Sequence, residues 1–240
     1  MNPEAERREL LDQIRQHADP RHQEGMSMAV PTGLKIYGVR VPDLREIART
    51  WQRAHKDVAR GDLMAVLDVL WEGQSREERL LVIYLLGRYK RWIPDLTWDY
   101  FERWRRDLDN WEVTDGLAQW VLSPWLLADP KRRLDRLWDL IDDKDVWSRR
   151  LGLVSTVPVN RSRKELTIPD LTLELVDRVK EERDGMITKA VSWALREMTK
   201  THPERVSAYL EENRDLLAAH VVREVDNKLQ TGLKSGKVKG

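Results

Sequence analysis

Hydrophobic residues recur with a period of about 3.6 along almost the whole chain, and this period restricts the fold more than any other feature. Leu44, Ile47, Ala48 and Trp51 follow the i, i+3, i+4, i+7 pattern of one helical face. Alternation typical of a strand occurs only in Leu34–Tyr37, which is too short to indicate a sheet. The sequence therefore predicts an all-α protein.

Helix start signals divide the chain into segments. Ser75 followed by Glu78 has the spacing of a capping box, and several prolines stand where a helix is expected to begin. Those prolines are Pro94, Pro130, Pro169 and Pro203. Helices are expected at residues 4–18, 42–54, 59–72, 76–90, 95–108, 111–127, 130–143, 146–156, 169–182, 187–201, 203–211 and 214–229.

Short polar loops between these helices favour stacked helical hairpins over a four-helix bundle. The hairpin period is roughly 35–40 residues, within the range of HEAT-type repeats, although no fixed residue pattern recurs. We expect a right-handed stack of degenerate HEAT-like hairpins that forms a single curved solenoid domain over residues 1–232. The last residues, 233–240 (LKSGKVKG), are expected to be a flexible basic tail.

Composition excludes several classes of protein and site. The chain has no cysteine, and its five histidines form no i, i+4 pair, so no metal site and no metal cofactor are expected. Neither a nucleotide-binding glycine motif nor a GxSxG motif occurs, and we expect no cofactor of any kind. No apolar run is long enough to span a membrane, and the charged start MNPEAERREL is unlike a signal peptide, so a cytoplasmic protein is expected. The absence of a heptad seam favours a monomer.

Two predicted helices place a charge in an apolar sector. Trp111, Asp115, Ala118 and Leu122 form one stripe, so Asp115 lies one turn from an indole. A structural interpretation fits Asp115 equally well, because the helix dipole favours a carboxylate near the start of a helix. Arg150 lies in the apolar sector of its helix and needs a carboxylate or an anionic ligand; a structural salt bridge is the simpler interpretation.

A third stripe combines cations with a tryptophan. Lys189, Trp193, Arg196 and Lys200 lie at i, i+4, i+7 and i+11, a pattern that suits a surface tracking phosphates with an aromatic contact. A solvated helix face with Trp193 in the core is the alternative for this stripe alone. The neighbouring acidic pairs Glu77–Glu78 and Glu211–Glu212 are interpreted as surface charge.

Tryptophan is unusually abundant, with 11 residues against a single phenylalanine. Trp147 is expected to anchor the helix that presents Arg150, Trp98 stays unassigned, and only Trp111 and Trp193 share a face with charges suited to DNA chemistry. The others are expected to pack between hairpins: Trp51, Trp71, Trp92, Trp104, Trp120, Trp125 and Trp138.

Four segments, in this order, resemble the DNA alkylation repair proteins of the AlkD type, which are HEAT-like-repeat glycosylases. They are Tyr37-Gly-Val-Arg-Val-Pro-Asp-Leu-Arg45, Trp111-Glu-Val-Thr-Asp115, Trp147-Ser-Arg-Arg150 and Trp193-Ala-Leu-Arg-Glu-Met-Thr-Lys200. The resemblance covers almost the whole chain. One departure is the stretch 25–33, which lacks the aromatic residue that many relatives carry there.

The resemblance implies roles for individual residues. Asp115 matches the catalytic carboxylate, Trp111 and Trp193 match aromatics that line the site, and Arg150 matches a basic residue of the cleft. Arg196 and Lys200 match cations that face the DNA backbone, and Lys189 and Arg149 are expected to bind DNA beside them. The implied partner is double-stranded DNA that carries alkylated purines, with the protein on the nucleoid when bound.

The implied reaction is hydrolysis of the N-glycosidic bond of purines alkylated at N3 or N7, which leaves an abasic site. Such a purine is cationic and leaves readily, so a carboxylate that stabilises the developing oxocarbenium ion is sufficient. Indole faces attract cations and would favour the charged lesion. No lysine is adjacent to Asp115, which favours a monofunctional enzyme without a lyase step.

A second hypothesis is a non-catalytic HEAT-type module that binds damaged or branched DNA, or a protein scaffold. Repeat folds often keep a binding surface without chemistry, because a fold does not determine a function. A steep loss of DNA affinity with salt would distinguish a DNA module from a scaffold. The sequence leaves the order of preference among alkylated bases open.

Overall fold

The computed structural model describes residues 1–161 and 166–236, and these contain helices and one isolated β-bridge but no strand. The bridge pairs Lys35 with Ser75, which is all that remains of the strand-like Leu34–Tyr37 segment. The chain divides into two compact units, Met1–Pro124 and Trp125–Gly240. The all-α prediction is confirmed, whereas the single domain over 1–232 stays a prediction.

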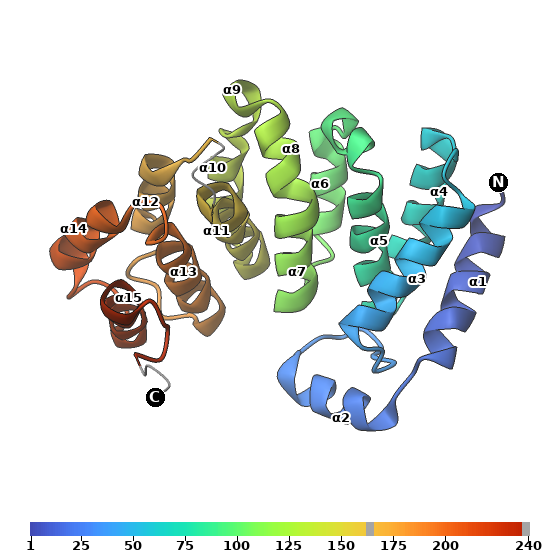
Figure 1. Ribbon diagram of the computed structural model, residues 1–240, viewed down its shortest axis with the longest axis horizontal. Helices are drawn as coiled ribbons and strands as arrows, with labels where there is room; N and C mark the ends of the chain where they lie inside the picture. The colour runs from blue at the N-terminus through green and yellow to red at the C-terminus, as the bar shows by residue number, and fades with distance from the viewer. Residues whose placement is uncertain (162–165, 237–240) are drawn as a thin grey trace. The chain divides into compact units, whose positions relative to one another are not determined.

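The first unit pairs helices in two rows (Figure 1). One row contains α3 (Val41–Ala54), α5 (Arg76–Arg88) and the continuous segment α7 (Trp111–Leu117), η2 (Ala118–Leu122) and α8 (Ser123–Ala128), which passes the unit boundary. The other contains α1 (Pro3–Gln16), α4 (Arg60–Trp71) and α6 (Trp98–Arg105). The row of α3, α5 and α7 carries the candidate residues of this unit. Leucine, isoleucine and tryptophan side chains fill the space between the rows, as the periodicity predicted.

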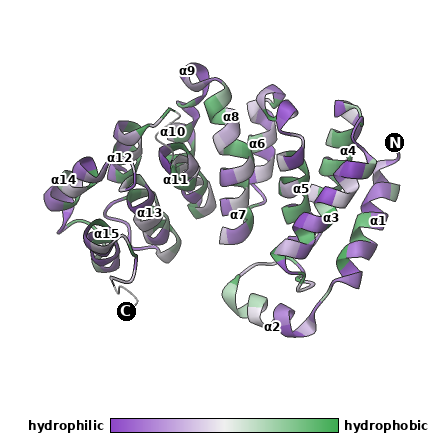
Figure 2. Cartoon of the chain, viewed as in Figure 1, coloured by the Kyte–Doolittle hydropathy of each residue, from purple (hydrophilic) through white to green (hydrophobic). Residues whose placement is uncertain are grey.

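The second unit repeats this plan. Helices α11 (Val146–Arg161), α13 (Gly185–Met198) and α15 (Ala219–Thr231) pack side by side, with α10 (Arg136–Ile141), α12 (Pro169–Asp177) and α14 (Pro203–Asn213) against them. A short helix α9 (Pro130–Arg133) precedes α10. In Figure 2, hydrophobic and hydrophilic residues alternate along the helices of both units, as expected for helices buried on one side.

Helix α2 (Pro20–Ala29) is absent from the sequence prediction, and the prediction of no helix there is wrong. Asp19 caps α2 by accepting hydrogen bonds from the backbone N–H groups of Arg21 and His22. None of the ten residues of α2 is buried, so the segment has no hydrophobic period to detect. The stretch 25–33 is therefore partly helical.

Several predicted boundaries also differ. Pro94 does not begin a helix but lies inside the short 3-10 helix η1 (Lys90–Asp95), and the predicted helix 130–143 is broken into α9 and α10. Helix α11 continues through Pro158 to Arg161, because Val157 and Val159 are buried and this packing outweighs the helix-breaking effect of proline.

At the end of the chain, residues 233–236 of the predicted tail are described and 237–240 lie outside the described residues. Gly232 ends α15 in the left-handed conformation, and the Lys234 ammonium lies 3.1 Å from a Glu224 carboxylate oxygen. Among the described residues, no helix is both long enough and apolar enough to cross a membrane.

Candidate functional site

Helix α7 begins at a strong N-terminal cap. The Asn110 side chain accepts hydrogen bonds from the backbone N–H groups of Glu112 (3.1 Å) and Val113 (3.0 Å), and the Thr114 hydroxyl donates to the Asn110 carbonyl. Asn110 is fully buried, so this cap holds the first turn firmly. An asparagine directly before a periodic segment is a cap signal that sequence reasoning could have used and missed.

Trp111 and Asp115 lie one turn apart on α7, as predicted. The Trp111 indole is half-buried, and its Nε1–H donates to the carbonyl of Ala29 at the end of α2 (3.0 Å). The Asp115 side chain is 8% exposed, and Ala118 and Leu122 on the same stripe are fully buried. A tethered indole and a carboxylate with a small accessible surface therefore lie next to each other.

The helix changes its hydrogen-bond pattern directly after Asp115. Residues 118–122 form a π-helical turn, in which the backbone N–H of Ser123 donates to the carbonyl of Ala118. The Ser123 hydroxyl donates to the same carbonyl (2.8 Å). Such turns insert an extra residue and re-aim the side chains around them, and they are frequent at functional sites. Trp120 lies in this turn; 38% of its surface is exposed, and its ring packs edge-on against Tyr84 and lies beside Gly87 of α5, as expected for a tryptophan between hairpins.

A buried ionic network ties α7 to the loop before α3. The Arg76 guanidinium binds both carboxylate oxygens of Glu112 at 2.6 Å and a Glu77 oxygen at 2.9 Å. Burial opposes the positive charge of Arg76, but hydrogen bonds and the charges of Glu112 and Glu77 raise its pKa above the usual value. The guanidinium thus stays charged inside the unit.

Glu77 holds the loop itself. Its carboxylate accepts hydrogen bonds from the backbone N–H groups of Tyr37, Gly38 and Val39, at 3.1, 3.0 and 3.3 Å. Glu77 is fully buried and Glu78 is 2% exposed, so their interpretation as surface charge is wrong. Periodicity alone misled here, because all but the last residue of α5 is buried and the helix has no exposed face.

Gly38 explains why this loop needs a glycine. Its φ is +79°, and a Cβ atom there would lie 2.4 Å from the carbonyl oxygen of Asp19 and 2.6 Å from the backbone nitrogen of Gln23. The loop thus runs against the first turn of α2, the helix whose last carbonyl holds Trp111. The motif that begins at Tyr37 is a structural support for the α7 site.

In the second unit, Arg150 is buried in α11, with 5% of its surface exposed. Its Nη1 donates to the carbonyl of Met186 in the first turn of α13 (2.6 Å). Leu151 and Val154, which the hydrophobic period assigns to the apolar stripe of this helix, are fully buried. The structure therefore confirms that Arg150 lies in an apolar sector, and it brings Arg150 to the start of the helix that carries Trp193.

The cationic stripe on α13 is mixed. Lys189 is exposed and makes no ion pair with a described residue, and Trp193 is half-buried. Arg196 lies 3.7 Å from a Glu224 oxygen and donates to the Ser192 hydroxyl (3.1 Å). Burial lowers the pKa of Arg196 relative to an exposed guanidinium, despite the charge of Glu224. Only part of the stripe is therefore open to a ligand.

Lys200 and Arg149, which were also predicted to bind DNA, bind groups within the second unit. The Lys200 ammonium donates to Glu197 (2.6 Å), a carboxylate that also binds Arg161 (3.1 Å). The Arg149 guanidinium donates to the carbonyls of Asp143 and Lys144 and binds Glu182. Arg149 thereby closes the turn between α10 and α11, so its observed contacts are structural.

Within the residues that the structure describes, no group of three histidine, cysteine, aspartate or glutamate side chains is arranged to hold a metal ion. The candidate residues offer a buried carboxylate and a half-buried indole on α7 of the first unit, and a buried guanidinium on α11 and a half-buried indole on α13 of the second. Such groups stabilise positive charge and orient phosphates.

Known protein families and solved structures were compared with the whole chain. The family model described as "DNA alkylation repair enzyme" matches residues 10–229. A solved structure described as "Predicted DNA alkylation repair enzyme from Enterococcus faecalis" is similar with a TM-score of 0.72 and 17% identity; the match covers 90% of this chain and 98% of that one. No curated protein matches the sequence significantly.

The structural similarity supports the all-α fold of stacked helical hairpins, and the family match extends over most of the chain, including both units and all four motifs. We conclude that the chain belongs to the DNA alkylation repair enzyme family.

Proposed function

We propose that the protein is a monofunctional DNA glycosylase that hydrolyses the N-glycosidic bond of cationic N3- or N7-alkylated purines in duplex DNA. The observation that carries the proposal is the pair on α7, where the buried Asp115 carboxylate stands one turn from the tethered indole of Trp111. The family match supports a role in DNA repair, and the pair on α7 suggests the reaction.

Asp115 would act on the sugar. As the C1′–N bond breaks, the alkylated base leaves with the bonding electron pair, its positive charge is neutralised and the deoxyribose becomes an oxocarbenium ion. A carboxylate with little access to water stabilises this cation more strongly than one in bulk solvent. Asp115 would also orient the water that attacks C1′ and accept a proton from it.

Trp111 and Trp193 would select the substrate, because indole faces attract the positive charge of an alkylated purine. The hydrogen bond from Trp111 to Ala29 fixes the orientation of its ring before DNA binds, which lowers the entropy lost on binding. Arg150 would bind a backbone phosphate through the donors of its guanidinium. Lys189, which is exposed, would track the same strand.

Release of alkylated bases tests the proposal. Duplex DNA treated with a methylating agent is incubated with the protein, and free 3-methyladenine and 7-methylguanine are measured by chromatography with mass detection. The Asp115→Asn variant keeps the size of the side chain and removes its charge, so we expect release to fall by roughly 100-fold or more, with DNA binding retained. The Asp135→Asn variant changes an exposed aspartate whose side chain makes no hydrogen bond or ion pair with a described residue, so it should release bases normally.

Three results would contradict the proposal. Absence of any released base from wild-type protein would exclude the glycosylase and leave a non-catalytic DNA-binding module. Full activity of Asp115→Asn would show that another group stabilises the sugar cation. Loss of activity in Asp135→Asn would show that the assay reports a general effect of charge.

A further inference from the structure

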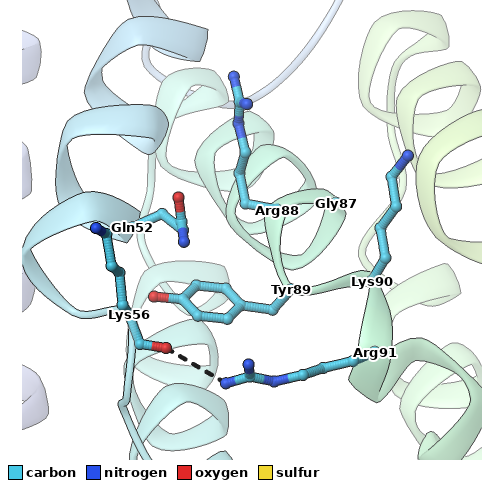
Figure 3. A pocket seen from close by; sticks show the side chains of 7 residues that line it. All are labelled: Gln52, Lys56, Gly87, Arg88, Tyr89, Lys90 and Arg91. Atoms are coloured by element: carbon cyan, nitrogen blue, oxygen red, sulfur yellow. Dashed lines mark hydrogen bonds between the residues drawn. The ribbon is translucent and has the colours of Figure 1, made fainter.

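A basic cavity lies in the first unit, at the C-terminal ends of α3 and α5. It has a volume of about 320 Å³, at the lower end of ligand-sized pockets, which span roughly 300–1,000 Å³. Its lining includes four cations and one aromatic ring but no acidic side chain, and Figure 3 shows these groups around Tyr89. The lining residues are Gln52, Lys56, Gly87, Arg88, Tyr89, Lys90 and Arg91. We call this cavity the basic pocket.

The cations of the basic pocket are not neutralised inside the protein. Within residues 1–161 and 166–236, none of Lys56, Arg88, Lys90 and Arg91 pairs with a carboxylate, and all four are exposed. Some other arginines of the unit are paired, such as Arg103 with Asp68 and Arg105 with Glu102. A cluster of unpaired like charges raises the local potential and attracts anions.

The helix dipoles do not explain this charge. Two helix C-termini contribute together about one negative elementary charge, because each is equivalent to roughly half a charge. The four cations of the basic pocket carry about three more positive charges than the two helix C-termini can neutralise. A single basic residue at each helix end would suffice for capping. This excess of positive charge favours an anionic ligand whose charge lies close to several N–H donors of the pocket.

Arg91 and Tyr89 form a rigid base for the pocket. The Arg91 guanidinium donates to the Lys56 carbonyl at 3.3 Å and lies 4.4 Å above the Trp92 ring, and Tyr89 stacks on Trp92 at 5.3 Å. The Tyr89 hydroxyl donates to the His55 carbonyl, and burial raises the pKa of Tyr89 to about 12, so the phenol stays neutral. In Figure 3 the Tyr89 ring lies between Lys56 and Arg91.

A second cavity shares Gly87, Arg88 and Lys90 with the basic pocket and extends it. This cavity is also lined by Arg45, Tyr84 and the exposed Trp120 ring. The Arg45 guanidinium lies 5.3 Å from the centroids of both rings, and it forms no ion pair with a carboxylate of the described residues, so it adds a fifth cation. Aromatic rings beside cations suit a ligand that combines phosphate with sugar or base.

We propose that the basic pocket binds backbone phosphates of duplex DNA. Trp120, which lines the second cavity, lies on the same continuous helical segment as Asp115 and follows it by five residues. The proposal rests on the proposed function for its ligand, duplex DNA, but not on base release.

Salt-dependent binding of unmodified duplex DNA tests the pocket. Fluorescence anisotropy with a labelled duplex of about 25 base pairs gives the dissociation constant between about 50 and 200 mM NaCl, where log K falls with log salt by roughly 0.9 per phosphate contact. The test variant is Arg88→Gln/Lys90→Gln, since neither side chain forms a hydrogen bond or ion pair with a described residue and the fold should be kept.

The control variant is Arg8→Gln/Arg106→Gln. It removes the same charge from two exposed arginines of α1 and the end of α6 that also form no ion pair with a described residue. We expect the test variant to lose one or two phosphate contacts, which makes the salt slope shallower by about 0.9 to 1.8. The affinity at 0.1 M salt should then fall by about eightfold per contact. The control should keep the wild-type slope.

Equal slopes for the test and control variants would overturn the proposal. Inorganic phosphate is the second probe: if it stabilises wild-type protein against heat more than the test variant while the DNA slopes are equal, the pocket takes free phosphate and DNA is excluded as its ligand. Wild-type protein that binds unmodified DNA but releases no alkylated base would refute only the proposed function. Protein that binds no DNA would refute both.

Discussion

The buried carboxylate of Glu77 offers the sharpest test of how the α7 site is supported. We predict that Glu77→Gln strongly destabilises the first unit although the substitution preserves shape. Glu77 is fully buried and accepts from three backbone N–H groups and from Arg76. A glutamine has a single acceptor oxygen, so its amide nitrogen must face at least one of these donors, whichever way the side chain is oriented.

The magnitude follows from the same contacts. Each buried donor without a partner costs about 1–3 kcal/mol, and removal of one partner from a buried ion pair costs about 3–5 kcal/mol. Arg76 keeps its two bonds to Glu112, which places the expected loss of unfolding free energy at about 3–5 kcal/mol. For a chain of 240 residues, this corresponds to a decrease of Tm of roughly 6–20 °C.

Thermal unfolding followed by circular dichroism gives the Tm, and urea titration gives the free energy. The matched control is Glu46→Gln, which removes the same charge from an exposed residue paired with Arg49 on α3 and should change stability by less than about 1 kcal/mol. If Glu77→Gln were within about 1 kcal/mol of wild type, the network would not hold the loop at Tyr37–Val39 as described, and the structural role of that motif would be refuted.

Three further predictions test single contacts. Trp111→Phe removes the hydrogen bond to Ala29, so amide exchange in residues 26–30 should accelerate by about fivefold, for a loss of about 1 kcal/mol; unchanged exchange would show that the bond does not hold α2. Lys189→Ala should make the salt slope of DNA binding shallower by about one without a change in Tm, whereas Arg149→Ala should lower the Tm. The reverse pattern would contradict the assignment of Lys189 to DNA binding and of Arg149 to the structure. Gly38→Ala should destabilise by more than about 1 kcal/mol because of its positive φ and the nearby Asp19 carbonyl, measured by urea unfolding; wild-type stability would refute this strain.

Hydrophobic periodicity and proline positions determined most helices of this chain. The faces of α3, α7 and α13 were predicted because each buries one stripe and exposes another, which leaves a period of 3.6 in the sequence. Asp115 and Arg150 were singled out as charges within such stripes, and both are buried. The sequence alone thus identified the fold class and the residues that break its pattern.

Helices without an apolar stripe were harder to interpret. Helix α2 buries no residue and was missed, whereas α5 was predicted from its capping box, but it buries all but one residue and so has no amphipathic period that marks an exposed face. The same cause hid the burial of Glu77 and Glu78, which, besides Arg76 and Ser75, bind groups 38 to 71 residues away in the chain. The π-turn at residues 118–122 was not predicted either, because its hydrogen bonds have no sequence signature.

Charge pairing was likewise decided by tertiary structure. A lysine or arginine on a helix face has the same local sequence signal whether it faces solvent, a carboxylate or a ligand. Packing separated the cases, since Arg149 and Lys200 bind carboxylates within their unit, whereas no carboxylate of the described residues pairs with the cations around Tyr89. The sequence therefore determined where charge stands along each helix. Only the folded chain determined which charges from different segments neutralise one another, such as Arg149 and Glu182, because these pairs join residues far apart in the sequence over a few ångströms.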